Sequence, residues 1–388
     1  MAIDKKAQKE KIRKIKIYNN KMYKEYEKVN KRRNIPESEY LTQMQDPKNL
    51  IEFDNLRSYF YTDVGTVKAV DGVSFAIPMG KTIGVVGESG CGKSVTSLSL
   101  MRLLQGPQGQ IAGGQIRYNQ ISKKRAVDIA KLPRKEMEKI RGNEIAMIFQ
   151  EPMTTLNPVF TIGNQIDESI LLHNPKMPKS EVRERTIEML KLVGIARAEG
   201  IYESYPHELS GGMRQRVVIA MALSCNPQLI IADEPTTALD VTIQAQILDI
   251  LRDLKDKINA SIMLITHDLG VVAEMADYVV VMYAGRIVEQ GTAKEIYHQP
   301  LHPYTVGLMK SRPILNEDID RLYSIPGNVP NPINLPKSCY FKNRCDKCME
   351  KCNGDYPGLI SVSPTHKVSC YLYDKGLVSD KKAKVGGK

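Results

Sequence analysis

The sequence has no long uninterrupted apolar segment. Across its 388 residues we find no run of about 18 uncharged apolar residues, the length that a membrane-spanning helix needs. The first residues are rich in lysine and lack the apolar stretch of a secretory signal, so we expect neither a signal peptide nor a membrane span. If the chain takes part in transport, the pore must belong to another chain.

Acidic residues are too few to balance the basic ones, and the excess lies mostly near the two ends. The net charge is +11, and residues 1–48 contain 14 Lys and Arg against 7 Asp and Glu. Because the region between the ends is nearly neutral, the charge does not favour a nucleic-acid-binding surface. The N-terminal extension is either a solvated, partly disordered arm or a basic amphipathic helix that contacts anionic lipid or a partner subunit. The helical alternative rests on the spacing of Ile12, Ile15, Tyr18, Met22, Tyr26 and Val29.

A glycine-rich loop follows the apolar strand predicted at residues 82–86 and precedes a predicted helix. It fits the pattern G-x-x-x-x-G-K-[ST], in which glycines let backbone N–H groups converge on phosphate oxygens. Lys93 is expected to bridge the β- and γ-phosphates of ATP, and the Ser94 hydroxyl to bind Mg²⁺. A turn without a ligand is the alternative, and the strand–loop–helix context disfavours it. The loop consists of Gly87, Glu88, Ser89, Gly90, Cys91, Gly92, Lys93 and Ser94.

Three further short apolar runs, at residues 144–149, 229–232 and 261–266, each end at a polar residue. Buried parallel strands have this pattern, because helices cover both faces of their sheet. The runs would deliver Gln150, Asp233 and His267 to the carboxyl edge of the sheet, where ligands bind. Asp233 is expected to bind Mg²⁺, and Glu234 to act as general base for the attacking water. Taken alone, an Asp-Glu pair or a His at a strand end is more often a solvated residue without a catalytic role.

One segment narrows this chemistry to a single family. Residues 209–216 read Leu-Ser-Gly-Gly-Met-Arg-Gln-Arg and precede the Asp233–Glu234 pair by about twenty positions. With the glycine-rich loop, Gln150 and His267, this order resembles the ATP-binding cassette (ABC) family from about Ile51 to Gly291. The resemblance implies an α/β fold: a P-loop ATPase core with a parallel sheet flanked by helices, an antiparallel β subdomain, and a helical subdomain inserted at about residues 152–226.

The resemblance also implies that two cassettes complete each other's active sites. The signature segment would cap the γ-phosphate held by the opposite subunit, and Asp240 would lie in the loop that contacts that subunit. Met213 stands where the commonest version of the family has Gln, which marks a subfamily of peptide importers. The signature residues are Ser210, Gly211, Gly212 and Met213.

Within one subunit, the resemblance adds roles for three more residues. Gln150 would contact Mg²⁺ and water and relay the nucleotide state to the helical subdomain. His267 would hydrogen-bond the γ-phosphate and fix Glu234, so that Glu234, His267 and Gln150 are the expected catalytic set. Phe60 is the best match to the aromatic platform for adenine, ahead of its neighbours Tyr59 and Tyr61.

Cysteines are scarce except near the C-terminus, where five of seven lie between residues 339 and 370. In a cytoplasmic enzyme such a cluster indicates a metal site rather than disulfides. A proline-rich composition from residue 300 predicts a separate, irregular module. The segments His302-Pro-Tyr-Thr305 and Ser324-Ile-Pro-Gly327, with residues 335–370, resemble the ATP-binding subunits of oligopeptide, dipeptide and nickel importers, which extends the resemblance to about Tyr371.

Four cysteine positions match that family's pattern, which resembles a [4Fe–4S] ligand set; four thiolates also suit zinc, and unligated thiols are the third alternative. Cys348 is additional and is an alternative to Cys370 as fourth ligand. We expect the metal to be a structural staple, and every residue that handles phosphate to lie before Gly291. The four matching positions are Cys339, Cys345, Cys352 and Cys370.

The expected organisation is a basic extension at residues 1–48, an ABC domain at 49–300, the Cys-rich module at 301–373 and a basic tail at 374–388. The expected function is ATP hydrolysis, with ATP and Mg²⁺ bound, that drives peptide uptake at the cytoplasmic face of the membrane. Its partners would be a second ATP-binding subunit in a heterodimer, two transmembrane permease subunits and an extracytoplasmic substrate-binding protein, without nucleic acid. The alternatives are a nickel importer subunit and a soluble ABC ATPase that acts on nucleic acid.

Overall fold

A computed structural model describes residues 2–32, 34–150, 155–236, 240–311, 323–333 and 335–374. Among these residues there is no helix with the length and hydrophobicity that crossing a membrane requires. Four predicted features fall partly outside the described ranges: the start of the inserted helical region at 152–154, the part of the subunit-contact loop at 237–239, the Cys-rich module at 312–322 and 334, and the basic tail from 375 onward.

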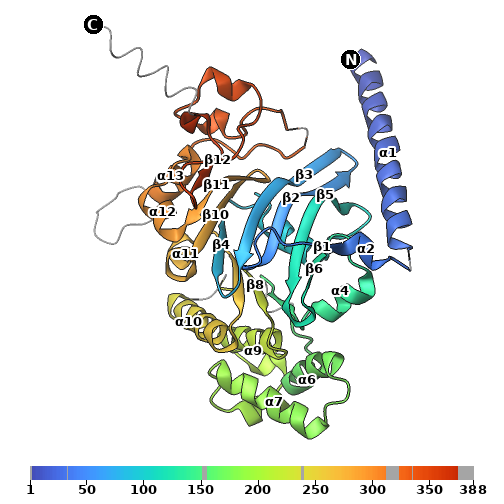
Figure 1. The fold of residues 1–388 in the computed structure, drawn as a ribbon, viewed down its shortest axis with the longest axis vertical. Coiled ribbons are helices and arrows are strands. Elements are labelled where there is room, and N and C mark those ends of the chain that lie inside the picture. Colours follow the sequence, from blue (N-terminus) through green and yellow to red (C-terminus); the bar gives the residue numbers. More distant parts are fainter. Residues whose placement is uncertain are drawn as a thin grey trace.

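An eight-stranded sheet forms the centre of the molecule, in the order β12-β13-β11-β10-β4-β9-β8-β7 (Figure 1). The five strands from β10 to β7 pair in parallel, and the other three pair antiparallel at one edge. Strands β4, β8 and β9 are buried along their whole length, as the prediction of strands covered on both faces requires. The strands are β4 (Thr82–Val86), β7 (Ile145–Ile148), β8 (Leu229–Asp233), β9 (Ser261–Ile265), β10 (Tyr278–Tyr283), β11 (Arg286–Thr292), β12 (Ile360–Ser361) and β13 (Lys367–Val368).

A second, antiparallel sheet of five strands has the order β1-β6-β5-β2-β3. Its long hairpin turns at residues 63–64, at the Asp-Val-Gly break visible in the sequence. Phe53 and Phe75 stack across this hairpin, with ring centroids 4.5 Å apart, and belong to the core that the two sheets share. The strands are β1 (Leu41–Thr42), β2 (Asn49–Thr62), β3 (Gly65–Pro78), β5 (Gly109–Gln120) and β6 (Arg125–Asp128).

Helices fill the remaining layers. Between β7 and β8 the chain forms a helical block of α6 to α9, which lies at the bottom of Figure 1. Ile166, Leu190 and Val217 from three of these helices are fully buried together. The helices are α2 (Glu37–Tyr40), α3 (Lys93–Leu100), α4 (Arg134–Ile140), α6 (Ile162–His173), α7 (Lys179–Leu192), α8 (Ala198–Glu203), α9 (Gly211–Leu223), α10 (Val241–Ile258), α11 (Leu269–Met275), α12 (Ala293–His298) and α13 (Pro303–Lys310), with short 3₁₀ turns at Ile121–Lys123, Pro206–Glu208, Lys342–Arg344, Glu350–Asn353 and Tyr371–Tyr373.

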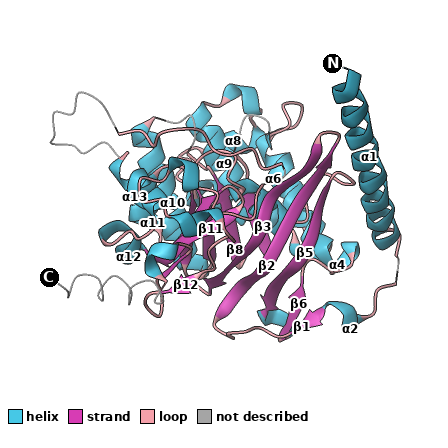
Figure 2. Cartoon of the chain, turned by 90° about the horizontal axis from the view of Figure 1, so that it is seen from above, coloured by secondary structure: helices cyan, strands magenta, loops and turns pink. Residues whose placement is uncertain are grey.

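The basic N-terminal extension begins as a long helix, α1 (Ala2–Asn30), that runs beside the antiparallel sheet (Figure 2). The Tyr23 hydroxyl donates to the carbonyl of Tyr61 at 2.6 Å, and the Asn19 amide donates to the carbonyl of Thr62 at 3.0 Å. The Tyr18 ring meets the Tyr61 ring edge-on at 5.9 Å. One face of α1 therefore packs on β2, while Ile12 and Ile17 are exposed.

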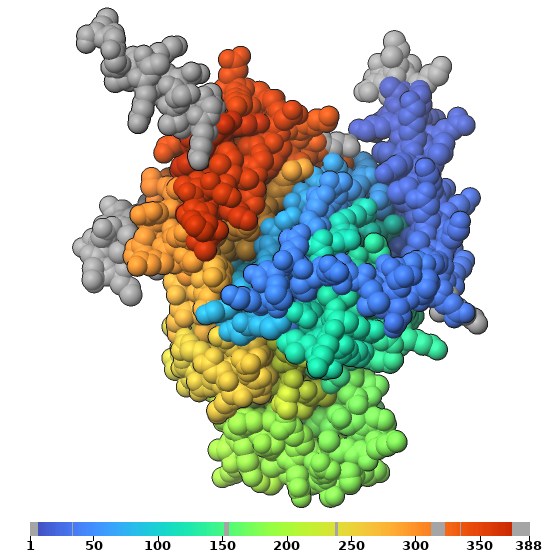
Figure 3. Space-filling view, in the orientation of Figure 1, coloured from blue at the N-terminus to red at the C-terminus, as the bar shows by residue number. Residues whose placement is uncertain are grey.

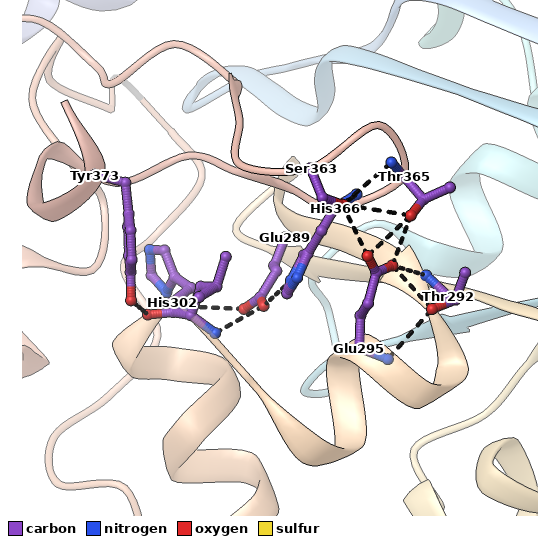
Figure 4. Close-up of polar contacts among 9 residues, drawn as sticks. Glu289, Thr292, Glu295, His302, Ser363, Thr365, His366 and Tyr373 are labelled. Atoms are coloured by element: carbon purple, nitrogen blue, oxygen red, sulfur yellow. Dashed lines mark hydrogen bonds and ion pairs between the residues drawn. The ribbon is translucent and has the colours of Figure 1, made fainter. Parts of the chain in front are cut away.

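The C-terminal module does not stand apart from the ATPase core. Figure 3 shows it packed over the neighbouring helices as one continuous surface. Its strand β13 pairs with β11 and so extends the central sheet. Buried Glu289 of β11 accepts hydrogen bonds from the backbone of Leu301 and His302, both at 2.8 Å, and from the His366 ring of the module at 2.7 Å (Figure 4).

Candidate active site

The glycine-rich loop joins buried β4 to α3 and is shaped by close backbone approaches. Gly87 has φ 149°, and a Cβ there would lie 2.2 Å from the carbonyl oxygen of Met282. Gly92 has φ 105° and caps the N-terminus of α3. No other residue type fits these two places. The Lys93 ammonium lies across the loop and donates to the carbonyl of Gly87 at 2.8 Å and of Glu88 at 3.2 Å.

Two oxygen-bearing side chains meet beside the loop. Ser94 Oγ donates to Asp233 Oδ1 at 3.0 Å, and Asp233 is 5% exposed. Burial raises the pKa of Asp233 and the nearby Glu234 carboxylate adds to this, while the Ser94 hydrogen bond and the Lys93 charge act the other way. A buried carboxylate next to a hydroxyl suits a hard divalent cation such as Mg²⁺, which favours the charged form.

The ends of three adjacent strands gather around Glu234. Gln150 Nε2 donates to Glu234 Oε2 at 3.0 Å, and His267 Nδ1 lies 3.3 Å from Glu234 Oε1. The Glu234 backbone is left-handed, with φ 48°, and its N–H donates to the carbonyl of Ile265 at 2.8 Å. A non-glycine residue in this conformation costs free energy, and such positions cluster at functional sites. The structure thus brings together the four predicted strand-end residues, Gln150, Asp233, Glu234 and His267.

The signature segment lies at the start of α9. Ser210 is exposed and caps the helix, accepting from the Met213 N–H at 3.3 Å. Asp240 caps α10 in the same manner, accepting from the Ile243 N–H at 3.0 Å. Gly212 faces Ile243, and a Cβ on it would lie 3.1 Å from that side chain. The two helix N-termini thus lie side by side, with Gly211 completing the first turn of α9.

Two of the three neighbouring aromatic residues on β2 make contacts within the protein: one donates a hydrogen bond and the other is buried. The Tyr59 hydroxyl donates to Asp71 Oδ1 at 2.5 Å, and Tyr61 is 3% exposed beneath α1. Phe60 is half-buried, and its ring packs over Gly109 of β5. Tyr59 is also half-buried, but Lys68 Nζ lies 5.7 Å from its ring centroid, so Phe60 stays the predicted adenine platform.

Four of the five clustered cysteines line one small cavity in the C-terminal module; they are Cys339, Cys345, Cys352 and Cys370. Burial raises the pKa of Cys339 and of Cys345 to about 11. Cys348, the alternative to Cys370 as fourth ligand, is exposed and does not line this cavity. Among the described residues, no three His, Cys, Asp or Glu side chains are close enough to hold a single metal ion. That spacing does not match a tetrahedral zinc site.

Sequence reasoning missed three contacts to the active-site loops. The Gln215 amide of α9 donates to the carbonyl of Pro235 at 2.6 Å, next to Glu234. The Glu88 N–H donates to the Tyr304 hydroxyl at 2.8 Å, and the Glu88 carboxylate pairs with Arg344. Gln215 follows the signature closely enough to have been suspected. Tyr304 and Arg344 lie 216 and 256 positions from Glu88, and no local pattern links them.

Solved structures with this fold are nucleotide-binding cassettes. The ATP-binding cassette MJ0796, in a dimeric post-hydrolysis state bound to ADP and Pi, matches with a TM-score of 0.55 and 25% identity, over 63% of this chain and 98% of that one. CbiO1 of Clostridium perfringens, part of an ABC transporter complex, matches with a TM-score of 0.54 and 27% identity, over 65% and 92%. The fold and its nucleotide loop define an ATPase of the ABC type.

Sequence comparisons place the chain more narrowly. The ABC transporter family model matches residues 70–237, and that of the oligopeptide/dipeptide transporter C-terminal region matches residues 288–352. The oligopeptide transport ATP-binding protein AppD of Bacillus subtilis is 53% identical over 84% of this chain and 97% of its own length. The dipeptide transport ATP-binding protein DppD of the same organism is 49% identical over 84% of this chain and 96% of its own length. The oligopeptide transport ATP-binding protein OppD of Salmonella typhimurium is 48% identical over 86% of this chain and 97% of its own length. The chain belongs to this family of ABC transporter ATP-binding proteins.

Proposed function

We propose that this chain is the ATP-hydrolysing subunit of an ABC importer for oligopeptides or dipeptides. In this proposal it works at the cytoplasmic face of the membrane with a second, different ATP-binding subunit, two permease subunits and an extracytoplasmic substrate-binding protein. One observation carries the catalytic part: Gln150, Asp233, Glu234 and His267 converge beside the glycine-rich loop. Similarity to peptide-transport subunits along nearly their whole length supports the substrate class.

The chain's own residues divide the hydrolytic chemistry among them. The backbone N–H groups of the loop and the Lys93 ammonium bind the phosphates. Ser94 and Asp233 would supply oxygen ligands for Mg²⁺, and Gln150 contacts the neighbouring Glu234. Glu234 orients the attacking water and accepts its proton. Gln150 and His267 hold the Glu234 carboxylate from two sides, and Phe60 offers its ring to the adenine.

The signature acts on the ATP of the partner subunit. Ser210 is exposed, and the first N–H groups of α9 provide a positive helix end that suits a γ-phosphate presented from outside. Asp240 lies at the start of the adjacent helix, where a partner subunit would make contact. Closure of two such subunits would bury both nucleotides.

Motion of the helical block then links hydrolysis to the permeases. The hydrogen bond from Gln215 to the carbonyl of Pro235 ties α9 to the loop that carries Glu234. Val159 and Phe160, just before α6, and Leu172 within α6 are 73%, 52% and 74% exposed. Large apolar side chains gathered at a surface mark a protein-binding site, and we assign this one to a permease subunit.

We further propose that the four cavity-lining thiols, Cys339, Cys345, Cys352 and Cys370, hold a [4Fe–4S] cluster as a structural staple. The donor chemistry fits, because such clusters take four Cys thiolates. Cluster binding would have to offset the cost of removing the protons from buried thiols such as Cys339 and Cys345, whose pKa values burial raises.

Reconstitution in vesicles tests the proposal. The full complex should hydrolyse ATP and accumulate a labelled peptide when the substrate-binding protein is present, and Lys93→Ala should abolish both. Uptake of nickel in place of peptide, or hydrolysis stimulated by DNA or RNA but not by the binding protein, would contradict it.

A further inference from the structure

The phosphate loop is held in place by the C-terminal part of the chain. Arg344 Nη1 donates to Glu88 Oε2 at 2.7 Å and Nη2 to Glu88 Oε1 at 2.9 Å, a two-pronged ion pair. The backbone N–H of the same Glu88 donates to the hydroxyl of Tyr304 in α13 at 2.8 Å. The backbone N–H and the side-chain carboxylate of Glu88 are therefore both held by residues that follow the ATPase motifs.

The guanidinium of Arg344 is fixed by further contacts. Its Nε donates to the carbonyl of Pro326 at 2.9 Å, Nη2 to the carbonyl of Ile325 at 3.3 Å, and Nη1 to the Tyr283 hydroxyl at 3.3 Å. The side chain is 4% exposed, against 29% for Glu88. The hydrogen bonds to Glu88 further raise the pKa of Arg344. The planar guanidinium of Arg344, held by these contacts, presents a single geometry to the Glu88 carboxylate.

An aromatic cluster lies under the same contact. The ring centroid of Tyr283 lies 4.7 Å from that of Tyr304 and 5.3 Å from that of Phe341, and those of Tyr304 and Phe341 are 5.5 Å apart. All three rings are buried. Tyr283 ends β10, Tyr304 lies in α13, and Phe341 precedes Arg344 in the module. The three elements therefore meet as one rigid support next to Glu88.

The charge of Glu88 makes this support relevant to nucleotide binding. Glu88 is the second residue of a loop that binds a polyanion, so an unpaired carboxylate there would repel the phosphates. The guanidinium of Arg344 balances the negative charge of the Glu88 carboxylate, and Tyr304 holds the Glu88 backbone. The N–H groups of the following loop residues can then bind the phosphates. This reasoning rests on the proposed ATP site.

We propose that Arg344 is a positioning residue of the nucleotide site, and that through it the cysteine module sets the affinity of the phosphate loop for ATP. Arg344 directly precedes Cys345, one of the cavity-lining thiols. In this proposal the module acts on the site through Glu88, while the residues expected to contact phosphate all lie before Gly291.

A double-mutant cycle on the full-length chain tests this, with a fluorescent ATP analogue as the probe. Arg344→Gln should raise the Kd by about tenfold, within the usual range of coupling between two sites, and the same change in a Glu88→Gln background should have a much smaller effect. In the assembled complex the loss should appear in KM rather than in kcat. The control, Lys351→Gln, removes another cation of the module, paired with Asp374 at 2.7 Å, and should leave the Kd unchanged.

The alternative is that Arg344 only stabilises the module. In that case Arg344→Gln would lower the melting temperature while the Kd stays the same, or the loss of affinity would be equal in both Glu88 backgrounds; either result overturns the proposal. If Arg344→Gln does not fold, Arg344→Lys keeps the charge but loses the fork, and the same cycle applies. Wild-type binding that is lost in Lys93→Ala shows separately that the ATP site itself is correctly assigned.

Discussion

Replacing Glu234 by Gln isolates the chemical step of the proposed reaction. The Glu234 side chain is 16% exposed and is contacted on one oxygen by Gln150 and on the other by His267. A Gln side chain has nearly the same shape, so phosphate and metal contacts through Lys93 and Asp233 should survive. The amide, however, cannot accept a proton from water. We therefore expect nearly unchanged ATP affinity and a closed, ATP-bound dimer that does not turn over.

The structure also predicts how the loss of hydrolysis rate in Glu234→Gln compares with the loss in His267→Ala. Removing a general base lowers the rate by about 10²–10⁴-fold, which corresponds to roughly 3–5 kcal/mol in activation free energy. His267→Ala leaves the Glu234 carboxylate in place and removes one contact to it. His267 is also expected to hydrogen-bond the γ-phosphate, so this variant loses two contacts; because each is worth about an ordinary net hydrogen bond, we expect a loss of about tenfold to a hundredfold.

Phosphate release by the assembled complex measures both variants, and binding of a fluorescent ATP analogue checks that the site still loads. Lys93→Ala serves as the control that should lose binding itself. A Glu234→Gln protein that hydrolyses ATP at a rate comparable to the wild type, or a His267→Ala protein that is slower than Glu234→Gln, would refute this division of roles.

Ser210→Arg should leave ATP binding by the same chain intact but block hydrolysis at the partner's site. The reason is that a bulky cation displaces the N–H groups that face the partner's γ-phosphate. Equal loss of ATP binding in the isolated chain would show that the signature acts within one subunit. Anaerobically purified protein should be brown, with about four irons per chain, and Cys345→Ser should bleach it whereas Cys348→Ser should not; colourless protein with zinc would contradict the cluster. Burial acts to raise the pKa of Glu295, but hydrogen bonds from neighbouring Thr and Ser groups hold it at about 2. Its contribution to stability should therefore be complete above about pH 4.5 and be lost as the pH falls toward 2; a melting temperature whose pH dependence is the same in Glu295→Gln would exclude this.

The ATPase core could be predicted because its signals are local. A short apolar run ending in a polar residue predicts a buried strand that carries a functional group to the sheet edge, and parallel pairing of β7, β8 and β9 places Gln150, Asp233 and His267 together there. The glycines at positions 87 and 92 indicated a backbone that passes close to other atoms. The order of these motifs indicated the ABC family, which the comparisons confirm; the catalytic roles of individual residues remain predictions.

Other features were decided only by tertiary packing. The basic N-terminal segment allowed either a solvated arm or a helix, and the contacts of Tyr18 and Tyr23 with β2 make it a docked helix. Composition predicted a separate C-terminal module, whereas pairing of β13 with β11 joins it to the core. The spacing of the cysteines left Cys348 and Cys370 equivalent, and burial distinguishes them.

The pair between Glu88 and Arg344 is the clearest case. Sequence alone determined that Glu88 lies in a phosphate loop and that Arg344 lies in a cysteine-rich module. It could not show that they meet, because a contact across 256 positions leaves no periodicity, spacing or composition in either segment. Their ion pair exists because β10 and α13 bring the module over the end of β4, an arrangement set by burial of Tyr283, Tyr304 and Phe341 in one core.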